Sequence, residues 1–165
     1  IVAAVEAATW EGLTLAPRVV APASPALAHA VVATALRDRA VVTVAVQDTT
    51  VVGLAVSMPP ANADARPHEL LTVGVAPDWR HHGLAMAMLR AHIDALAVAT
   101  PGTTLHVEVT IAERDVVEPM EPSVRADSIE RTLRRAGFEV GPADAAVRGV
   151  DPRAISATLT LGGRR

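Results

Sequence analysis

The fold is decided by residues 73–85, which read Val73-Gly74-Val75-Ala76-Pro77-Asp78-Trp79-Arg80-His81-His82-Gly83-Leu84-Ala85. Apolar residues up to Ala76 are typical of a strand, which Pro77 ends, and a helix begins at Gly83. The first N–H groups of a helix have no partner within it and carry partial positive charge. Gly83 leaves no side chain between these groups and an anion, and Arg80 adds a full charge. The stretch therefore predicts a strand, a phosphate-binding turn and a helix.

Strands and helices alternate on both sides of this turn. Val-rich runs at 40–46 and 51–57 predict an antiparallel hairpin. The order of elements predicts an α/β fold with a mixed, mostly antiparallel central sheet of six to seven strands flanked by helices. Residues 13–165 form the expected domain, and residues 1–12 are expected to be a short helix (1–11) or the remnant of an upstream segment. Extended segments are expected at 13–20, 69–76, 103–110, 138–140 and 155–161. Helices are expected at 24–38, 83–97 and 125–136. The helix at 125–136 is expected to be the last one, and Gly137 ends it.

Composition excludes several classes of protein. A net charge of −3 with no basic run argues against a nucleic-acid partner. No cysteine is present, which excludes disulfides and thiolate metal sites, and all 15 basic residues are Arg, which excludes the lysine-dependent phosphate loop of NTPases. No stretch is apolar over the roughly 20 residues that a membrane span needs. We therefore expect a cytoplasmic protein without a membrane partner. Since the chain does not start with Met, we expect an upstream segment.

Two motifs of this chain resemble those of the GNAT superfamily of N-acetyltransferases. Arg80-His81-His82-Gly83-Leu84-Ala85 matches the family's Arg/Gln-x-x-Gly-x-Gly/Ala turn, and Leu133 to Phe138 matches its helix ending in Gly-Phe. The resemblance implies acetyl-coenzyme A as cosubstrate, its pyrophosphate held by backbone N–H groups of residues 80–85. It also implies a pantetheine arm along 73–75, in a splay between that strand and the strand at 103–110, with a bulge at Gly74. The implied cofactor-binding residues are Val73, Val75, Arg80, His81, His82, Gly83, Leu84 and Ala85.

An amine must lose its proton before it attacks a thioester, so a proton acceptor is expected. Glu69 lies eleven residues before Arg80, and histone acetyltransferases of the superfamily place their general base at a similar distance. Glu69 is therefore the first choice for the base, and Glu108 and His106 on the neighbouring strand are the second. The family's thiol-protonating Tyr, four residues before the Gly of Gly-Phe, is Leu133 here, and the chain has no Tyr. Water or Ser128 is expected to assist the leaving thiol instead.

Other interpretations of the chain stay open at this point. The missing Tyr favours a catalytically inactive, acyl-coenzyme A binding or regulatory domain, and an α/β scaffold without cofactor is the third reading. Trp79 is interpreted as a packing residue. Adjacent His81 and His82 diverge at a helix start, so no metal site is expected. The acceptor is expected to be a small-molecule or protein amine selected by the loops at 58–68 and 111–124, and a homodimer is possible by analogy with similar proteins.

Overall fold

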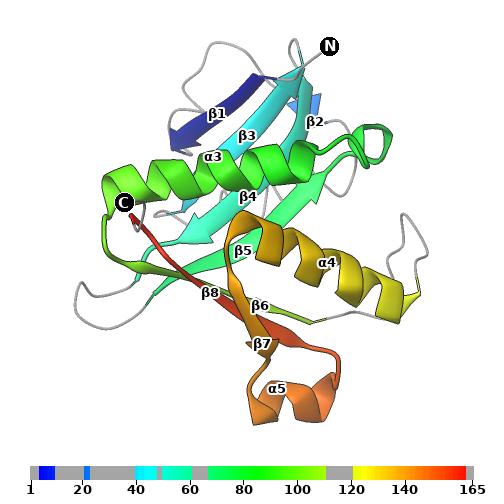
Figure 1. The fold of residues 1–165 in the computed structure, drawn as a ribbon. Coiled ribbons are helices and arrows are strands. Elements are labelled where there is room, and N and C mark those ends of the chain that lie inside the picture. The colour runs from blue at the N-terminus through cyan, green and yellow to red at the C-terminus, as the bar shows by residue number, and fades with distance from the viewer. Residues whose placement is uncertain are drawn as a thin grey trace.

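A computed structural model describes residues 4–9, 21–22, 40–47, 50–60, 67–110 and 121–162, the first two ranges as backbone only. Within these ranges one twisted sheet runs through the molecule in the order β1-β3-β4-β5-β6-β8-β7, with the two-residue β2 paired to β4 (Figure 1). Every neighbouring pair on this path is antiparallel except β5–β6. This confirms the expected mixed, mostly antiparallel sheet. The strands are β1 (Ala4–Thr9), β2 (Ala21–Pro22), β3 (Val41–Gln47), β4 (Thr50–Met58), β5 (His68–Val75), β6 (Thr104–Val109), β7 (Glu139–Pro142) and β8 (Ile155–Thr160).

The parallel pair β5–β6 separates almost as soon as it forms. Only His68 with Leu105 and Glu69 with His106 are in register, at the start of both strands. Beyond this pair β5 stays bonded to β4 and β6 to β8, so a gap opens within the sheet toward the carboxyl ends of β5 and β6. The splay expected between these two strands is therefore present.

A bulge lies in β5 at Leu71. The β4 residues Val56 and Ser57 are consecutive, yet they pair with Thr72 and Leu70, which leaves Leu71 without a partner in β4. The bulge expected at Gly74 is therefore wrong, because Gly74 pairs in register with Leu54. One inserted residue reverses which side chains face each side of a strand. His68 and Leu70 face the helices before the bulge, and Val73 and Val75 face them after it.

Two long helices cover one face of the sheet (Figure 1). Helix α3 (Leu84–Ala99) contacts β1, β3, β4 and β5, whereas α4 (Pro122–Ala136) contacts β7 and β8. Gly137 ends α4 in a left-handed conformation (φ 100°), as predicted, because its N–H and that of Phe138 bond the free carbonyls of Arg134 and Leu133. A third described helix, α5 (Ala145–Val150), was not expected, so α4 is not the last helix.

The core has a layer on each side of β3 and β4. Between the sheet and the helices, Leu89 and Leu96 of α3 and Leu133 of α4 pack with apolar residues of β5, β6 and β8 and with Phe138. Away from α3, Val42, Val44, Leu54 and Val56 are also buried. Strand β4 is therefore buried on both faces, which explains its unbroken apolar run. Since β5 borders this core, its carboxyl end and the turn after it have a rigid base.

Residues 4–9 form strand β1, so the helix expected over 1–11 is wrong. All six residues of β1 pair with β3 in antiparallel register. The expected extended segment at 13–20 and helix at 24–38 lie outside the described residues, as do most of the two loops named for acceptor choice. Among the described helices, none has the length and apolar character needed to cross a bilayer.

Candidate functional site

The turn between β5 and α3 is held in shape by backbone bonds and two left-handed residues. The short 3₁₀ helix η1 (Pro77–Trp79) begins at Pro77, and the N–H of Arg80 bonds the carbonyl of Pro77 at 3.1 Å. His81 (φ 64°) and Gly83 (φ 79°) then turn the chain into α3. Such a conformation costs a residue with a Cβ roughly 1 kcal/mol or more, and Gly avoids that cost. Strain at His81 is of the kind that folds tolerate at functional sites.

The amino end of α3 presents backbone N–H groups without acceptors. Gly83 occupies the cap position with no side-chain hydrogen bond, and its own carbonyl receives the N–H of Ala87. In the described part of the chain, the N–H groups of Leu84, Ala85 and Met86 have no acceptor. A Cβ built on Gly83 would meet no atom within 4 Å, so the space beside these amides is open. The predicted condition for anion binding, exposed amides at a helix start, is thus met.

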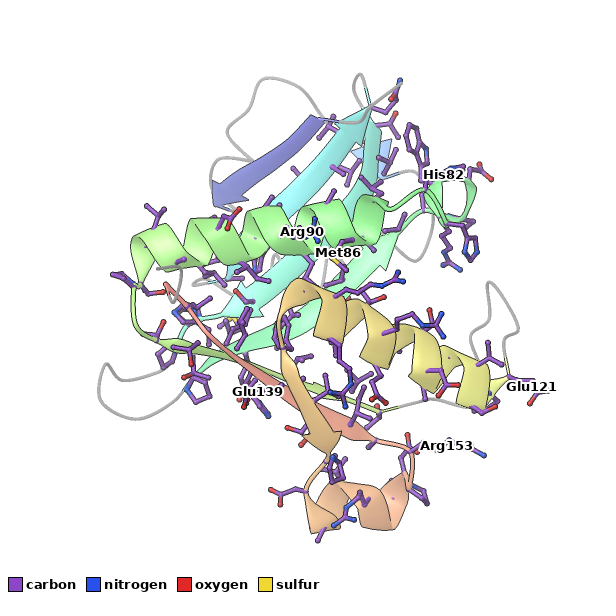
Figure 2. All side chains as sticks on the ribbon, in the orientation of Figure 1. His82, Met86, Arg90, Glu121, Glu139 and Arg153 are labelled. Carbon is purple, nitrogen blue, oxygen red and sulfur yellow. The ribbon has the colours of Figure 1, made fainter. Side chains whose placement is uncertain are left out.

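A cleft of about 700 Å³ runs from this turn between α3 and α4. Figure 2 shows Met86 and Arg90 on the part of α3 that borders the gap to α4. From α4 come three residues spaced four and three apart, which places them on one stripe of that helix. The lining residues are Val75, Trp79, Arg80, His81, Gly83, Leu84, Ala85, Met86, Arg90, Ser128, Thr132 and Arg135.

The cleft is positively charged. Its lining includes the guanidinium groups of Arg80, Arg90 and Arg135 and no Asp or Glu. Arg80 donates from Nε to the carbonyl of Val75 at 3.2 Å, which fixes its charge at the end of β5. No carboxylate among the described residues pairs with Arg90 or Arg135, whereas the neighbouring Arg134 is bound to Glu130 outside the cleft. Three cations beside a helix amino end favour a ligand with several negative charges.

Most of the predicted cofactor residues line this cleft. Six of the eight are lining residues: Val75, Arg80, His81, Gly83, Leu84 and Ala85. The other two lie outside the cleft, because Val73 packs in the core and His82 points to solvent (Figure 2). Sequence reasoning missed Met86, Arg90, Thr132 and Arg135. Their i, i+4 spacing on α3 and i, i+3 spacing on α4 was visible, but no pattern indicated that these two helix faces meet. Trp79 lines the cleft and also packs against the core, which agrees with its interpretation as a packing residue.

On α4, the position of the family's Tyr is filled by a core residue. Leu133 is only 5% exposed and packs with α3 and the sheet. Two hydroxyl groups lie instead on the cleft side of α4, those of Ser128 and Thr132. The Thr132 hydroxyl donates to the carbonyl of Ser128 at 2.9 Å, so its proton is used within the helix. The Ser128 hydroxyl is the one able to donate into the cleft.

The three side chains expected as proton acceptors, Glu69, His106 and Glu108, lie on the opposite face of the sheet, away from α3 and α4. Glu69 and His106 are register partners at the point where β5 and β6 separate, and Glu108 follows two residues along β6. Both carboxylates are exposed and His106 is half-buried. His106 Nε2 lies 2.9 Å from the Ser156 hydroxyl of β8. We call this surface the far face; it comprises Glu69, His106, Glu108, Ser156 and Thr158.

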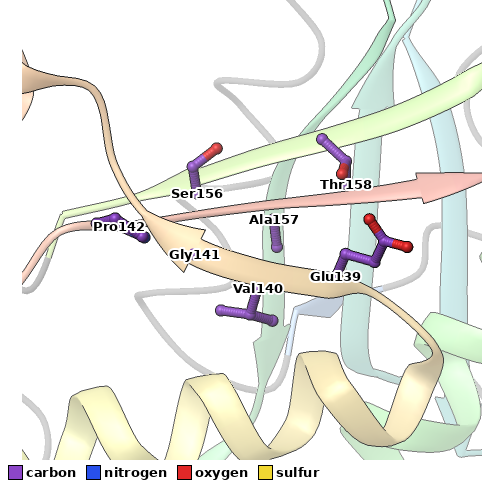
Figure 3. Close-up of a pocket in the computed structure, with 7 residues that line it drawn as sticks. All are labelled: Glu139, Val140, Gly141, Pro142, Ser156, Ala157 and Thr158. Atoms are coloured by element: carbon purple, nitrogen blue, oxygen red, sulfur yellow. The ribbon is translucent and has the colours of Figure 1, made fainter.

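A second cavity, of about 340 Å³, lies on β7 and β8. Figure 3 shows the side chains of Glu139, Ser156 and Thr158 on the side away from α4, whereas Val140 and Ala157 point toward it. This alternation agrees with the burial of Ala157 in the core below the helices. The cavity is distant in the fold from the amino end of α3, so the cationic cleft remains the candidate cofactor site. No group of His, Asp or Glu able to hold a metal ion occurs in the described ranges.

A buried polar cluster fixes α3 to the sheet. His92 is fully buried, and its two ring nitrogens each lie 2.9 Å from a hydroxyl, Thr43 of β3 and Ser57 of β4. Burial, with a smaller contribution from nearby His68, lowers the pKa of His92 to about 4. His68 lies 3.1 Å from the hydroxyl of Thr100, which itself donates to the carbonyl of Leu96; burial lowers the pKa of His68 too. These groups position the helix that carries the anion site.

Comparisons with known proteins identify the fold. No family model and no curated protein sequence matches the chain. Among solved structures, a putative GNAT-family acetyltransferase from Desulfovibrio desulfuricans matches with a TM-score of 0.61 at 19% identity, covering 84% of this chain and 83% of that one. The ribosomal-protein-S18-alanine N-acetyltransferase from Escherichia coli matches at 0.59 and 18%, covering 98% and 96%. An aminoglycoside 6'-N-acetyltransferase complexed with coenzyme A matches at 0.56 and 14%, covering 86% and 83%. The chain has the GNAT acetyltransferase fold.

Proposed function

We propose that this chain, with its GNAT acetyltransferase fold, transfers an acetyl group from acetyl-coenzyme A to the amine of a small molecule or a protein. The observation that carries the proposal is the cationic cleft, in which unpaired amides of α3 and three Arg side chains meet. A diphosphate at Gly83–Met86 would receive backbone hydrogen bonds and face Arg80. Each charge-assisted bond contributes roughly 1.5–3 kcal/mol, so a few suffice for micromolar binding. One matched structure was solved with coenzyme A, which supports this choice of ligand.

The splay in the sheet supports the path of the acyl arm. Val75 lines the cleft, and the strands separate from Glu69 and His106 onward. Val75 and Glu69 are six positions apart along β5, a length of about 20 Å at 3.3 Å per residue. An extended pantetheine arm bound along this strand would bring its thioester near the point where β5 and β6 separate. There the gap leads to the far face, from which the acceptor amine would approach.

The far face offers the groups that an ammonium acceptor needs. Glu69, the register partner of His106, and Glu108, two residues along β6, are exposed carboxylates, and opposite charges attract a protonated amine. The choice of Glu69 as general base stays a prediction at this stage. Matched structures include enzymes named for a protein alanine and for aminoglycosides as acceptors, which supports the general class of amine acceptor.

Two measurements test the proposed function. Acetyl-coenzyme A at about 100 times its Kd should stabilise the protein by about 2.7 kcal/mol, seen as a rise in Tm. Free-thiol release should then depend on an amine, tested with a monoamine, a polyamine, an aminoglycoside and a peptide with a free amino terminus. A Tm unchanged by acetyl-coenzyme A would refute both binding and turnover.

The second candidate function is an acyl-coenzyme A binding or regulatory domain without turnover. The specific observation in its favour is the buried Leu133 at the position of the family's Tyr. This candidate predicts the same rise in Tm but no amine-dependent thiol release. The two functions are therefore separated by the second measurement alone.

Removing the cleft cations Arg90 and Arg135 should weaken cofactor binding. For Arg90→Gln combined with Arg135→Gln, we expect the Kd for coenzyme A to rise about tenfold, since exposed charges contribute roughly 0.2–1 kcal/mol each. Raising the salt to about 0.5 M should narrow the difference from the wild type, because it screens exposed charges. The matched control is Arg153→Gln, an exposed Arg before β8 and outside the cleft, which should leave the Kd unchanged. Calorimetric titration measures all three. Equal Kd values for the double variant and the control would contradict the site.

Ser128 should assist departure of the thiol. A thiol with an ordinary pKa near 8.5 leaves without much help, so we expect Ser128→Ala to lower kcat about tenfold, below the usual range for general acids, with KM for acetyl-coenzyme A unchanged. The control Ser123→Ala lies on the first turn of the same helix and does not line the cleft. Steady-state thiol release compares the two. If kcat of Ser128→Ala equals that of the control, the prediction is wrong and water protonates the departing sulfur.

A further inference from the structure

The hydrogen bond between His106 and Ser156 is a feature that the proposed cofactor cleft does not explain. It joins β6 to β8 on the far face, where the donor and acceptor are both half-buried side chains. Ser156 is the register partner of Glu108, so the bond runs diagonally across the two strands. In the described part of the chain, the imidazole Nδ1 has no partner. Nε2 is thus hydrogen-bonded to Ser156, and Nδ1 is able to bond a ligand.

The position of this imidazole is set by the splay. Glu69–His106 is the last register pair before β5 and β6 separate, so the ring lies at the start of the gap that we assign to the thioester. Parallel register partners project from the same face, which places the Glu69 carboxylate beside the ring. Glu108 is two residues farther along β6 on that face, and Glu139 of β7 lies opposite Thr158. These are the titratable groups that the described strands turn to the far face around His106.

Resting on the proposed function, we propose that His106 is the general base of the reaction, that Ser156 is its positioning residue, and that Glu69 binds the acceptor's ammonium group. The imidazole holds one proton on Nε2 and donates it to the Ser156 hydroxyl, which leaves the Nδ1 lone pair to accept a proton. Imidazole is the side chain with an ordinary pKa nearest neutral pH, and a base works best there. The carboxylates of Glu69 and Glu108 are both exposed to water, where they can attract an ammonium ion.

The chemical steps balance without another reactant. The ammonium group transfers one proton to His106 Nδ1 and becomes a neutral amine. Its lone pair forms a C–N bond with the thioester carbonyl, and the C–S bond breaks as the tetrahedral intermediate collapses. The second nitrogen proton is lost and the departing sulfur gains one, so the products are the amide and the thiol. The imidazolium then releases its proton to solvent.

The test compares four variants in the full chain, using the best amine from the panel. His106→Gln should lower kcat about 100-fold or more, within the usual range for a general base, and leave KM for acetyl-coenzyme A unchanged. We expect kcat of the wild type to level off to a plateau at high pH, the profile of a general base, and this plateau should be replaced in His106→Gln by a rate that rises with pH throughout. Ser156→Ala should lower kcat about tenfold, and Ser156→Thr, which keeps the hydroxyl, should restore it. Glu69→Gln should raise KM for the amine and leave kcat and its plateau in place.

Controls make the result independent of folding. Glu139→Gln, on the same side of the sheet but outside the proposed site, should match the wild type in kcat and KM. Added imidazole should restore part of the kcat of His106→Ala and none of the lost amine affinity of Glu69→Gln, a result that a misfolded variant does not give. Retention of kcat and plateau in His106→Gln, with loss of both in Glu69→Gln, would overturn the assignment and return the base to Glu69. A wild type that binds acetyl-coenzyme A without turnover would also overturn it, whereas failure to bind would refute the proposed function itself.

Discussion

Gly83→Ala should bind acetyl-coenzyme A more weakly while keeping its fold. The substitution places a Cβ beside the unpaired amides of α3, in space that is open without a ligand. We expect the Kd to rise about 10- to 100-fold, the equivalent of one charge-assisted hydrogen bond, roughly 1.5–3 kcal/mol. Because Gly83 has a φ of 79°, the substitution should also lower the free energy of unfolding by about 1–2 kcal/mol. Calorimetric titration and chemical denaturation measure the two effects.

The chain contains a matched control for the strain. Gly102, in the turn between α3 and β6, has the same φ of 79° and no atom within 4 Å of a Cβ. Gly102→Ala should therefore lose about the same 1–2 kcal/mol of stability and none of the cofactor affinity. If the two variants bind acetyl-coenzyme A equally well, the amino end of α3 is not the diphosphate site.

The stability of the protein should fall steeply in mild acid because of His92. In the folded state the pKa of His92 is lowered to about 4, whereas in the unfolded chain it has its ordinary value of 6.5. Between these values the unfolded state binds a proton that the folded state excludes. The stabilisation is therefore complete above about pH 7 and is lost as the pH falls from 6.5 toward 4, by about 3 kcal/mol in total. Because the pKa of His68 is also lowered, its protonation adds to the loss of stability as the pH falls.

Denaturation with urea at several pH values checks this dependence, with His92→Gln as the comparison. Gln does not titrate and cannot reach both Thr43 and Ser57 with the geometry of a ring, so the variant should be less stable at pH 8 by about 1–3 kcal/mol. Its stability should then change much less between pH 6.5 and 4, with the part due to His68 remaining. A parallel pH dependence in wild type and variant would show that His92 is not the group responsible.

Local rules predicted the turn and the helix ends because single residues determine them. Gly83 and Gly137 adopt the left-handed conformation that few other residues tolerate, and Pro77 ends the strand before the turn. The hairpin β3–β4 and strands β6 and β8 were likewise predicted by their apolar patterns. The motif at 80–85 therefore indicated both the fold and the amino end of the helix that borders the cleft.

What the sequence did not show depends on tertiary packing. Residues 4–9 contain Ala and Glu, which favour a helix, but six pairs with β3 override that preference. Helix α5 has only six residues, too few for a periodic pattern. Leu71 is an ordinary apolar residue, and nothing around it indicates a bulge. Arg90 and Arg135 are 45 positions apart, on helices whose contact could not be derived from either one.

The separation of β5 from β6 gives this sheet an edge in its middle. An edge strand exposes alternate peptide N–H and C=O groups that a neighbouring strand would otherwise satisfy, and proteins usually protect such edges at the periphery. Between the two well-paired halves, residues 70–74 of β5 have no strand partner on the β6 side within the described residues, so an amide-containing chain can pair there as a short additional strand. A pantetheine arm contains two amide groups, and this geometry would recognise its backbone rather than its acyl group. Recognition of the cofactor and selection of the acyl chain would then depend on different parts of the same gap.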